Sequence, residues 1–286
     1  MRLFCLGEGK IMKLSKVIAI PAIALAAGIS LAGCGSHPAV HHTHSTTHPT
    51  PNSTKPDTMI PAPGGPMIPA TPDGAAGLVT AGTQYSLNWS GYAATGKETS
   101  VSSAWTVPSV SCPTAQLQYS AFWVGLDGLK DSTVEQDGTI SGCYDSAPFY
   151  YAWYEMYPAG MVPFSNPVYE GDHFTASVSV SSGKYYTLVI SDSTRKWSHT
   201  VKVTKSGLAD SSAEVIAEAP SSTSGILPLA DFHNVYFSED HVNGRVMGDY
   251  SLTTIAMLDN SGLHKDNVSG TSDVGQKFSV SWARSS

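Results

Sequence analysis

The chain has 286 residues, and its first 77 differ in composition from the rest, which leaves 209 residues (286 − 77) for a folded part. That length is ample for one all-β domain with its own core. From Leu78 onward there are 11 Lys and Arg against 20 Asp and Glu, a balance of −9. This balance argues against a nucleic-acid partner and against a polybasic membrane surface.

Residues 1–33 have the pattern of a signal peptide. Lys13 and Lys16 precede an apolar stretch, residues 17–31, that is too short and too rich in Ala for a comfortable membrane span. The stretch ends in Leu-Ala-Gly-Cys, which resembles a bacterial lipobox with Cys34 as the lipidated residue. We therefore expect an exported protein held to the outer face of the membrane through Cys34. An ordinary cleavage site nearby, giving a secreted protein, is the alternative, and translation starts at Met1 or Met12.

Residues 34–77 have the composition of a disordered linker, rich in Pro, Thr, Ser and His. Five of the ten His residues lie here, at positions 37, 41, 42, 44 and 48. Such a tract binds metal in some proteins. The simpler interpretation is a solvated tether that gains positive charge below about pH 6.5.

From residue 78 onward the sequence predicts many short strands. Runs rich in Val, Ile, Thr and aromatic residues alternate with Gly, Ser, Pro and Asp clusters, and no segment has a long helical period. The pattern is typical of an antiparallel sandwich or barrel, and without βαβ alternation it disfavours a parallel sheet. The predicted strands are residues 85–93, 101–107, 120–126, 149–157, 174–180, 185–191, 198–204, 213–218, 231–237, 250–257 and 277–282.

Two cysteines, Cys112 and Cys143, lie in the predicted folded part. In an exported protein this pair is expected to form a disulfide, which contributes on the order of 3 kcal/mol by closing a loop of roughly 30 residues. Two free buried thiols are the alternative.

Several common hydrolase motifs are absent from residues 78–286. The sequence has no Gly-x-Ser-x-Gly elbow, no His-Glu-x-x-His zinc motif and no paired Asp-Thr/Ser-Gly loops, and its five His are scattered. We therefore expect neither a metal nor a cofactor. Carboxylates among aromatic residues remain, and Tyr151, Trp153, Glu155 and Tyr157 share one face of a predicted strand. Burying an unpaired carboxylate is costly, so Glu155 is either hydrogen-bonded structure or part of a site.

Eight motifs follow one another across most of the predicted domain. Their order and spacing resemble the glutamic peptidases, or eqolisins, which are secreted acid endopeptidases with a two-sheet β-sandwich fold. The resemblance implies a polypeptide substrate, and we expect a monomer. The motifs are residues 88–92 (NWSGY), 104–109 (AWTVPS), 122–128 (FWVGLDG), 135–138 (EQDG), 151–158 (YAWYEMYP), 170–172 (EGD), 213–218 (AEVIAE) and 227–232 (LPLADF).

The resemblance implies roles for two residues. Gln136, in a motif that resembles a turn, matches the catalytic Gln, and Glu218 matches the catalytic Glu at the end of its strand. Glu218 would act as general base on a water and then protonate the leaving amine, while Gln136 positions the water and stabilises the oxyanion. Alternation places Glu214, Ile216 and Glu218 on one strand face, with the small residues between them facing the opposite sheet.

Five further residues match positions that line or support the cleft of the family, namely Trp123, Asp127, Tyr151, Trp153 and Glu155. Core packing is the alternative for both Trp residues, and turn capping is the alternative for Asp127.

The sequence departs from the family at several positions. Tyr151 replaces an Asp, Asp137 replaces the Thr after the catalytic Gln, and Ala219 stands where an Asp commonly follows the Glu. These changes leave open an altered pH optimum, a narrowed substrate range or lost activity. Two rival interpretations are a surface module that binds carbohydrate or protein through aromatic side chains, and an inactive homologue with a structural role.

Overall fold

The computed structural model describes residues 64–72 and 82–286. The predicted signal peptide, Cys34 and the His-rich part of the predicted linker lie outside the described residues. Within the described residues, no helix is long and apolar enough to cross a membrane.

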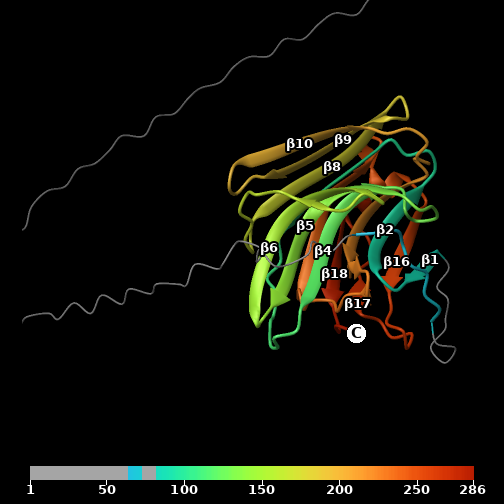
Figure 1. Cartoon of the computed structure of the whole chain (residues 1–286). Coiled ribbons are helices and arrows are strands. Elements are labelled where there is room, and N and C mark those ends of the chain that lie inside the picture. The colour runs from blue at the N-terminus through green and yellow to red at the C-terminus, as the bar shows by residue number, and fades with distance from the viewer. Residues whose placement is uncertain (1–63, 73–81) are drawn as a thin grey trace, which may run out of the picture. The chain divides into compact units, whose positions relative to one another are not determined.

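Two large sheets make up the domain, as the all-β prediction required (Figure 1). Each has eight strands. The first sheet has the order β1 (Thr83–Ser86), β16 (Leu252–Met257), β2 (Trp89–Thr95), β11 (Ser212–Glu218), β4 (Gln118–Leu126), β5 (Val134–Tyr144), β6 (Ala147–Tyr157) and β7 (Val162–Pro163). The second has the order β10 (Trp197–Thr204), β9 (Tyr185–Asp192), β8 (His173–Ser181), β3 (Ser100–Thr106), β14 (Asn234–Val242), β18 (Lys277–Trp282) and β17 (Asp266–Val268), with β15 (Arg245–Val246) beside β14.

Smaller elements connect the strands. A two-stranded hairpin, β12 (Ser221–Ser222) and β13 (Gly225–Ile226), follows β11 directly. Two single-turn 3-10 helices, η1 (Met247–Asp249) and η2 (Asp273–Gly275), are the helices of the described residues. One strand pair of the first sheet, β1 with β16, is parallel, and its other pairs are antiparallel.

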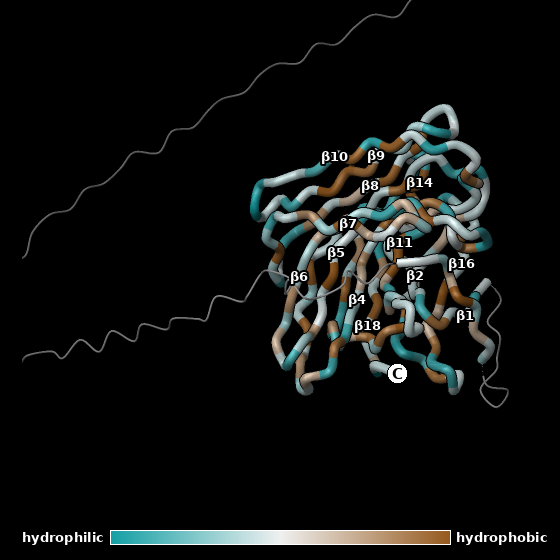
Figure 2. The backbone as a smooth tube through the Cα atoms, viewed as in Figure 1, coloured by the Kyte–Doolittle hydropathy of each residue, from teal (hydrophilic) through white to brown (hydrophobic). Residues whose placement is uncertain are grey.

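The main core lies between the two sheets. Alternate residues of the strands point into it, so that the strands contain most of the hydrophobic stretches while the turns are hydrophilic (Figure 2). On β11 the inward residues are Ala213, Val215 and Ala217, as the alternation predicted. Their small side chains let the second sheet pack closely.

A second hydrophobic cluster covers the opposite, outer face of the first sheet. We call this surface the outer face. Ile216 belongs to this cluster, and so do Trp89, Trp123 and Trp153, all of them fully buried. A sheet that is apolar on both faces is unusual for an antiparallel sandwich, whose outer surface is generally solvated. We therefore expect the outer face either to be covered by another part of the chain or to have a function.

Two details of the strand prediction were wrong. The predicted strand 85–93 is two strands, because the Ser86 hydroxyl accepts the backbone N–H groups of Asn88 and Trp89 and turns the chain between β1 and β2. The turn expected around Gln136 is part of β5, a strand of eleven residues. Its Glu-Gln-Asp-Gly sequence has low β-propensity, and pairing with β4 on one side and β6 on the other overrides that preference.

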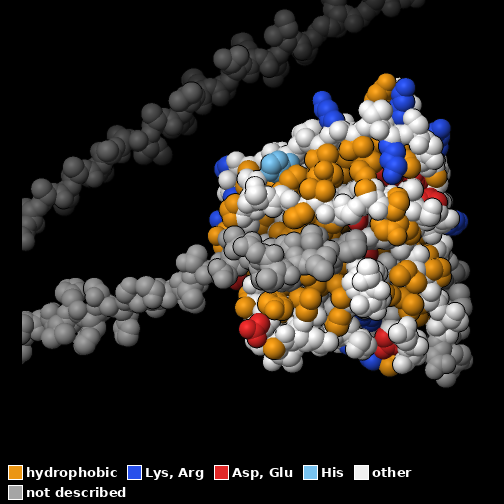
Figure 3. All heavy atoms as spheres, in the orientation of Figure 1, with side chains coloured by type: hydrophobic (Ala, Val, Ile, Leu, Met, Phe, Trp, Pro, Cys, Tyr) orange, Lys and Arg blue, Asp and Glu red, His pale blue; other side chains and the backbone are white. Residues whose placement is uncertain are grey.

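Many carboxyl groups of the domain are buried. Figure 3 accordingly shows few acidic side chains on the visible face. Asp137 points from β5 into the core, is fully buried and has no hydrogen-bond partner among the described residues, so burial raises its pKa well above the ordinary value. Burial therefore favours the uncharged form of the Asp137 carboxyl group. On the same strand, Cys143 forms the expected disulfide with Cys112.

Candidate active site

Gln136 lies on β5, an interior strand of the first sheet, and its side chain faces the outer face. Its neighbours across the ladder are Gly125 on β4 and Glu155 on β6. Gly138, two residues along β5, is required by close packing, because a side chain there would overlap the backbone of Phe122 and Trp123 on β4. The sequence that looked like a turn therefore allows β5 to approach β4 closely and presents Gln136 to the outer face.

Glu218 ends β11 on the same outer face and is fully buried. Its Oε2 accepts the indole N–H of Trp123 at 2.8 Å, and its Oε1 accepts the Asn88 amide at 3.3 Å. Burial raises the pKa of Glu218 to about 8, and these hydrogen bonds oppose the shift. The hydrogen bond from Trp123 thus orients the carboxyl group of Glu218.

Glu155 contacts Gln136 and is close enough to Glu218 to feel its charge. Its Oε2 accepts the Gln136 Nε2–H at 2.7 Å. Burial, followed by repulsion from the Glu218 carboxylate, raises the pKa of Glu155 to about 8. The structure therefore brings Gln136, Glu155 and Glu218 into one group with Trp123. The Gln136 Oε1 is buried and has no hydrogen-bond partner among the described residues.

The two other predicted supporting residues on β6 are further from this group. Trp153 is fully buried in the outer-face cluster, directly across from Gly138. Tyr151 lies four residues from Glu155, stacks on Phe149 with ring centroids 6.2 Å apart, and donates its hydroxyl to the Met161 sulfur. Both residues belong to the hydrophobic cluster of the outer face.

Asp127 serves a different part of the fold. Its carboxylate accepts the backbone N–H groups of Ala209, Asp210 and Ser211 at 2.7–3.1 Å. These bonds hold the loop that leads into β11. Asp127 itself has a φ of 68°, a conformation that Asp tolerates in turns. Its geometry is that of a loop anchor rather than of a group in the cleft.

Asn88 is a site residue that the sequence reasoning did not select. Its Nδ2 donates to Glu218 and to the carbonyl of Pro66, and its Oδ1 accepts the N–H of Ile68 at 2.8 Å. Pro66 and Ile68 belong to residues 64–72, which fall within the predicted linker. The sequence did contain a signal for Asn88, because Asn88 is the first residue of the first of the eight motifs.

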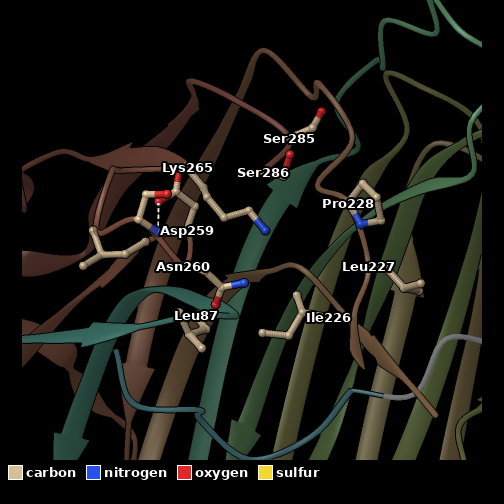
Figure 4. A pocket seen from close by; sticks show the side chains of 11 residues that line it. Leu87, Ile226, Leu227, Pro228, Asp259, Asn260, Lys265, Ser285 and Ser286 are labelled. Carbon is tan, nitrogen blue, oxygen red and sulfur yellow. Dashed lines mark hydrogen bonds between the residues drawn. The ribbon is translucent and has the colours of Figure 1, made fainter. Parts of the chain in front are cut away.

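A separate pocket of about 350 Å³ lies near the end of the outer face (Figure 4). Leu87, Leu227 and Lys265 are among its lining residues, and the Lys265 side chain extends into it. Burial lowers the pKa of Lys265 to about 8. Neither Gln136 nor Glu218 lines this pocket, so it is not the place where the candidate catalytic groups meet.

The described residues contain no cluster of three or more His, Cys, Asp or Glu side chains with the geometry to hold a metal ion. What the arrangement offers is a pair of carboxyl groups with raised pKa values, an amide and an indole donor. Such groups can hold a water, transfer a proton and donate to a developing negative charge.

Comparison with known proteins places the chain in a family. Residues 87–282 match the peptidase A4 family, and no curated protein sequence matches the chain. Scytalido-glutamic peptidase with a transition-state analogue inhibitor is 25% identical with a TM-score of 0.60, over 68% of this chain and 98% of that one. The fold is also shared with aspergilloglutamic peptidase from Aspergillus niger, at 24% identity and a TM-score of 0.52, over 58% of this chain and 99% of that one. The chain therefore belongs to the peptidase A4 family, the glutamic peptidases.

Proposed function

We propose that the protein is an acid-acting endopeptidase in which Gln136 and Glu218 are the catalytic residues. The observation that carries this proposal is the convergence of Gln136, Glu155 and Glu218 on one buried face, with Trp123 and Asn88 orienting the Glu218 carboxyl group. The side chains come from three different strands, so their convergence depends on the fold and not on their proximity in sequence.

In the proposed reaction, the Glu218 carboxylate takes a proton from a water whose oxygen attacks the scissile carbonyl carbon. The second Nε2–H of Gln136, which is not used by Glu155, donates to the oxyanion. Glu218 then gives its proton to the leaving nitrogen as the C–N bond breaks, and the products are an acid and an amine. Base action requires the Glu218 carboxylate, so we expect water entering the cleft to lower its raised pKa.

The proposal includes the cellular location. An exported peptidase tethered through a lipid on Cys34, with residues 34–77 as its linker, would act outside the membrane. The alternative of a sugar-binding module would need exposed aromatic rings on the outer face, whereas Trp89, Trp123 and Trp153 are fully buried there. The arrangement of the Trp residues therefore favours the peptidase.

Substitution of the two residues tests the proposal. We expect Glu218→Gln to reduce cleavage of a denatured protein at acid pH by roughly 100-fold or more, because it removes the general base. Gln136→Ala should reduce the cleavage rate on the order of 100-fold, because it removes the hydrogen bond that stabilises the oxyanion. Glu239→Gln, which removes one exposed carboxylate from the second sheet, is the matched control and should retain full activity. Full cleavage by both cleft variants would refute the assignment.

A further inference from the structure

A buried lysine lies in the pocket at the end of the outer face, which we call the Lys265 pocket. Lys265 is 4% exposed, and its side chain extends into this pocket of about 350 Å³ (Figure 4). Its ammonium group forms no hydrogen bond and no ion pair with a described residue. Removing an ammonium group from water without a partner is costly. An anionic ligand that pairs with Lys265 would offset that cost.

Asp259 is near Lys265, but its carboxylate is bound by other groups. Its Oδ1 accepts the backbone N–H groups of Ser261 and Leu263 at 2.8 and 2.9 Å. Its Oδ2 faces the Arg284 guanidinium at 3.9 Å. Asp259 therefore attracts Lys265 from a distance without pairing with it.

Asp266 follows Lys265 in the sequence and does not neutralise it at acid pH. The Asp266 Oδ1 accepts the Ser90 hydroxyl at 2.6 Å, and burial raises the pKa of Asp266 to about 7. At pH 5 this carboxyl group is therefore mostly protonated, whereas Lys265, with a pKa of about 8, keeps its charge. The pocket thus presents a positive charge at the pH where the proposed peptidase works.

Much of the remaining pocket lining is apolar. Four partly exposed apolar residues contribute to it, namely Leu87, Ile226, Leu227 and Pro228. Figure 4 shows the Lys265 side chain extending towards Ile226 and Pro228. The Asn260 amide also lines the pocket and can donate a hydrogen bond to a ligand. A ligand that suits this lining has a carboxylate beside an aliphatic group, which is the chemistry of a peptide that ends in an aliphatic residue.

Two short connections place the Lys265 pocket beside the candidate catalytic residues. Leu87, in the pocket lining, precedes Asn88, whose amide donates to Glu218 at 3.3 Å. The N–H of Leu227 donates at 2.8 Å to the carbonyl of Pro220, which lies two residues after Glu218. Two extended residues and one hydrogen bond span at most roughly 10 Å, or about three residues of extended peptide. A peptide in the cleft can therefore reach the pocket.

We propose that the Lys265 pocket binds the free C-terminal carboxylate of a peptide that occupies the cleft, about three residues beyond the bond that is cleaved. The inference deepens the proposed function and rests on it for the effect on cleavage, whereas binding rests on the pocket alone. An α-carboxyl group has a pKa of about 3.5, below those of Asp and Glu side chains, so it stays ionised further into the acid range. The enzyme therefore favours bonds close to the C-terminus of its substrate.

Calorimetric titration of the full chain at pH 5 tests the binding, with the tripeptide Ala-Ala-Leu and its C-terminal amide as probes. The wild type should bind the free acid about tenfold more tightly than the amide. Lys265→Met removes the charge and keeps an unbranched side chain, so it should bind both probes equally. Lys202→Met, at an exposed position on β10, is the matched control and should keep the preference. Equal binding of both probes to the wild type, or an unchanged preference in Lys265→Met, would overturn the inference.

Hydrolysis separates failure of this inference from failure of the proposed function. For a peptide that ends three residues after the cleaved bond, amidation should raise KM about tenfold and leave kcat unchanged. A preference for the acid in binding, without hydrolysis by the wild type, supports the pocket and refutes the peptidase. Hydrolysis with the same KM for acid and amide leaves the peptidase standing and overturns the role of the pocket in substrate binding. Thermal melting checks that Lys265→Met is folded.

Discussion

Substitution of Asp240 can measure how a buried carboxyl group affects the pH dependence of folding stability. Asp240 is 1% exposed on the second sheet, where its Oδ1 accepts the Ser103 hydroxyl at 2.6 Å and its Oδ2 has no partner among the described residues. Burial raises the pKa of Asp240 from 3.8 to about 7. The folded protein therefore holds a proton that the unfolded chain releases above pH 3.8.

The size of this effect on stability follows from the shift in the pKa of Asp240. Folded protein binds more protons than unfolded chain between these two pKa values, so the contribution of Asp240 to stability falls as the pH rises through that window. A shift of about three units corresponds to about 4 kcal/mol, since each unit is worth about 1.36 kcal/mol. The loss of folding stability caused by Asp240 should be below about 1 kcal/mol at pH 4 and about 2 kcal/mol at pH 5.5. Above pH 7 it should reach its full value of about 4 kcal/mol.

Asp240→Asn removes the titration and keeps the shape. Relative to the wild type, we expect the variant to gain about 4 kcal/mol in free energy of unfolding at pH 8 and little at pH 4. Urea unfolding at pH 4, 5.5, 7 and 8 measures this. Asp249→Asn, the same change at an exposed residue paired with Arg245, is the control and should show a small difference without this trend. An equal difference between Asp240→Asn and wild type at pH 4 and pH 8 would refute the reasoning.

Two further predictions concern Tyr151 and Cys34. We expect Tyr151→Asp, which introduces the carboxylate of the family pattern, to cost about 3–5 kcal/mol at neutral pH and to add no activity, because Tyr151 is 4% exposed and stacked on Phe149. A urea midpoint within error of the wild type would contradict this. Export in a bacterial host should yield a mature N-terminus whose mass includes a lipid on Cys34, and Cys34→Ala should abolish detergent partitioning. An unmodified mature N-terminus would exclude the anchor.

Much of the fold was predictable because its signals are local or ordered along the chain. The alternation of β11 correctly separated Ala213, Val215 and Ala217, which face the second sheet, from Ile216 and Glu218 on the outer face. The order of eight motifs indicated the family. Both inferences depend on residue type and spacing, which the sequence contains in full.

The candidate site was only partly predictable. Gln136 and Glu218 were selected by resemblance, but the sequence placed Gln136 in a turn, because Glu-Gln-Asp-Gly disfavours a strand when judged alone. Asn88 was quoted in a motif and given no role. Its importance arises from contacts with residues 66, 68 and 218, and such long-range contacts have no local signature.

The sequence by itself determined the class of fold, the family and the identity of the two candidate catalytic side chains. The tertiary structure decided that Gln136 lies on a central strand, that Glu155 bonds to it, and that residues 64–72 lie over the site. The physical reason is that strand pairing and burial are set by partners distant in sequence. A carboxyl group such as Glu218 has an ordinary pKa in the unfolded chain and a raised one only when the fold removes it from water.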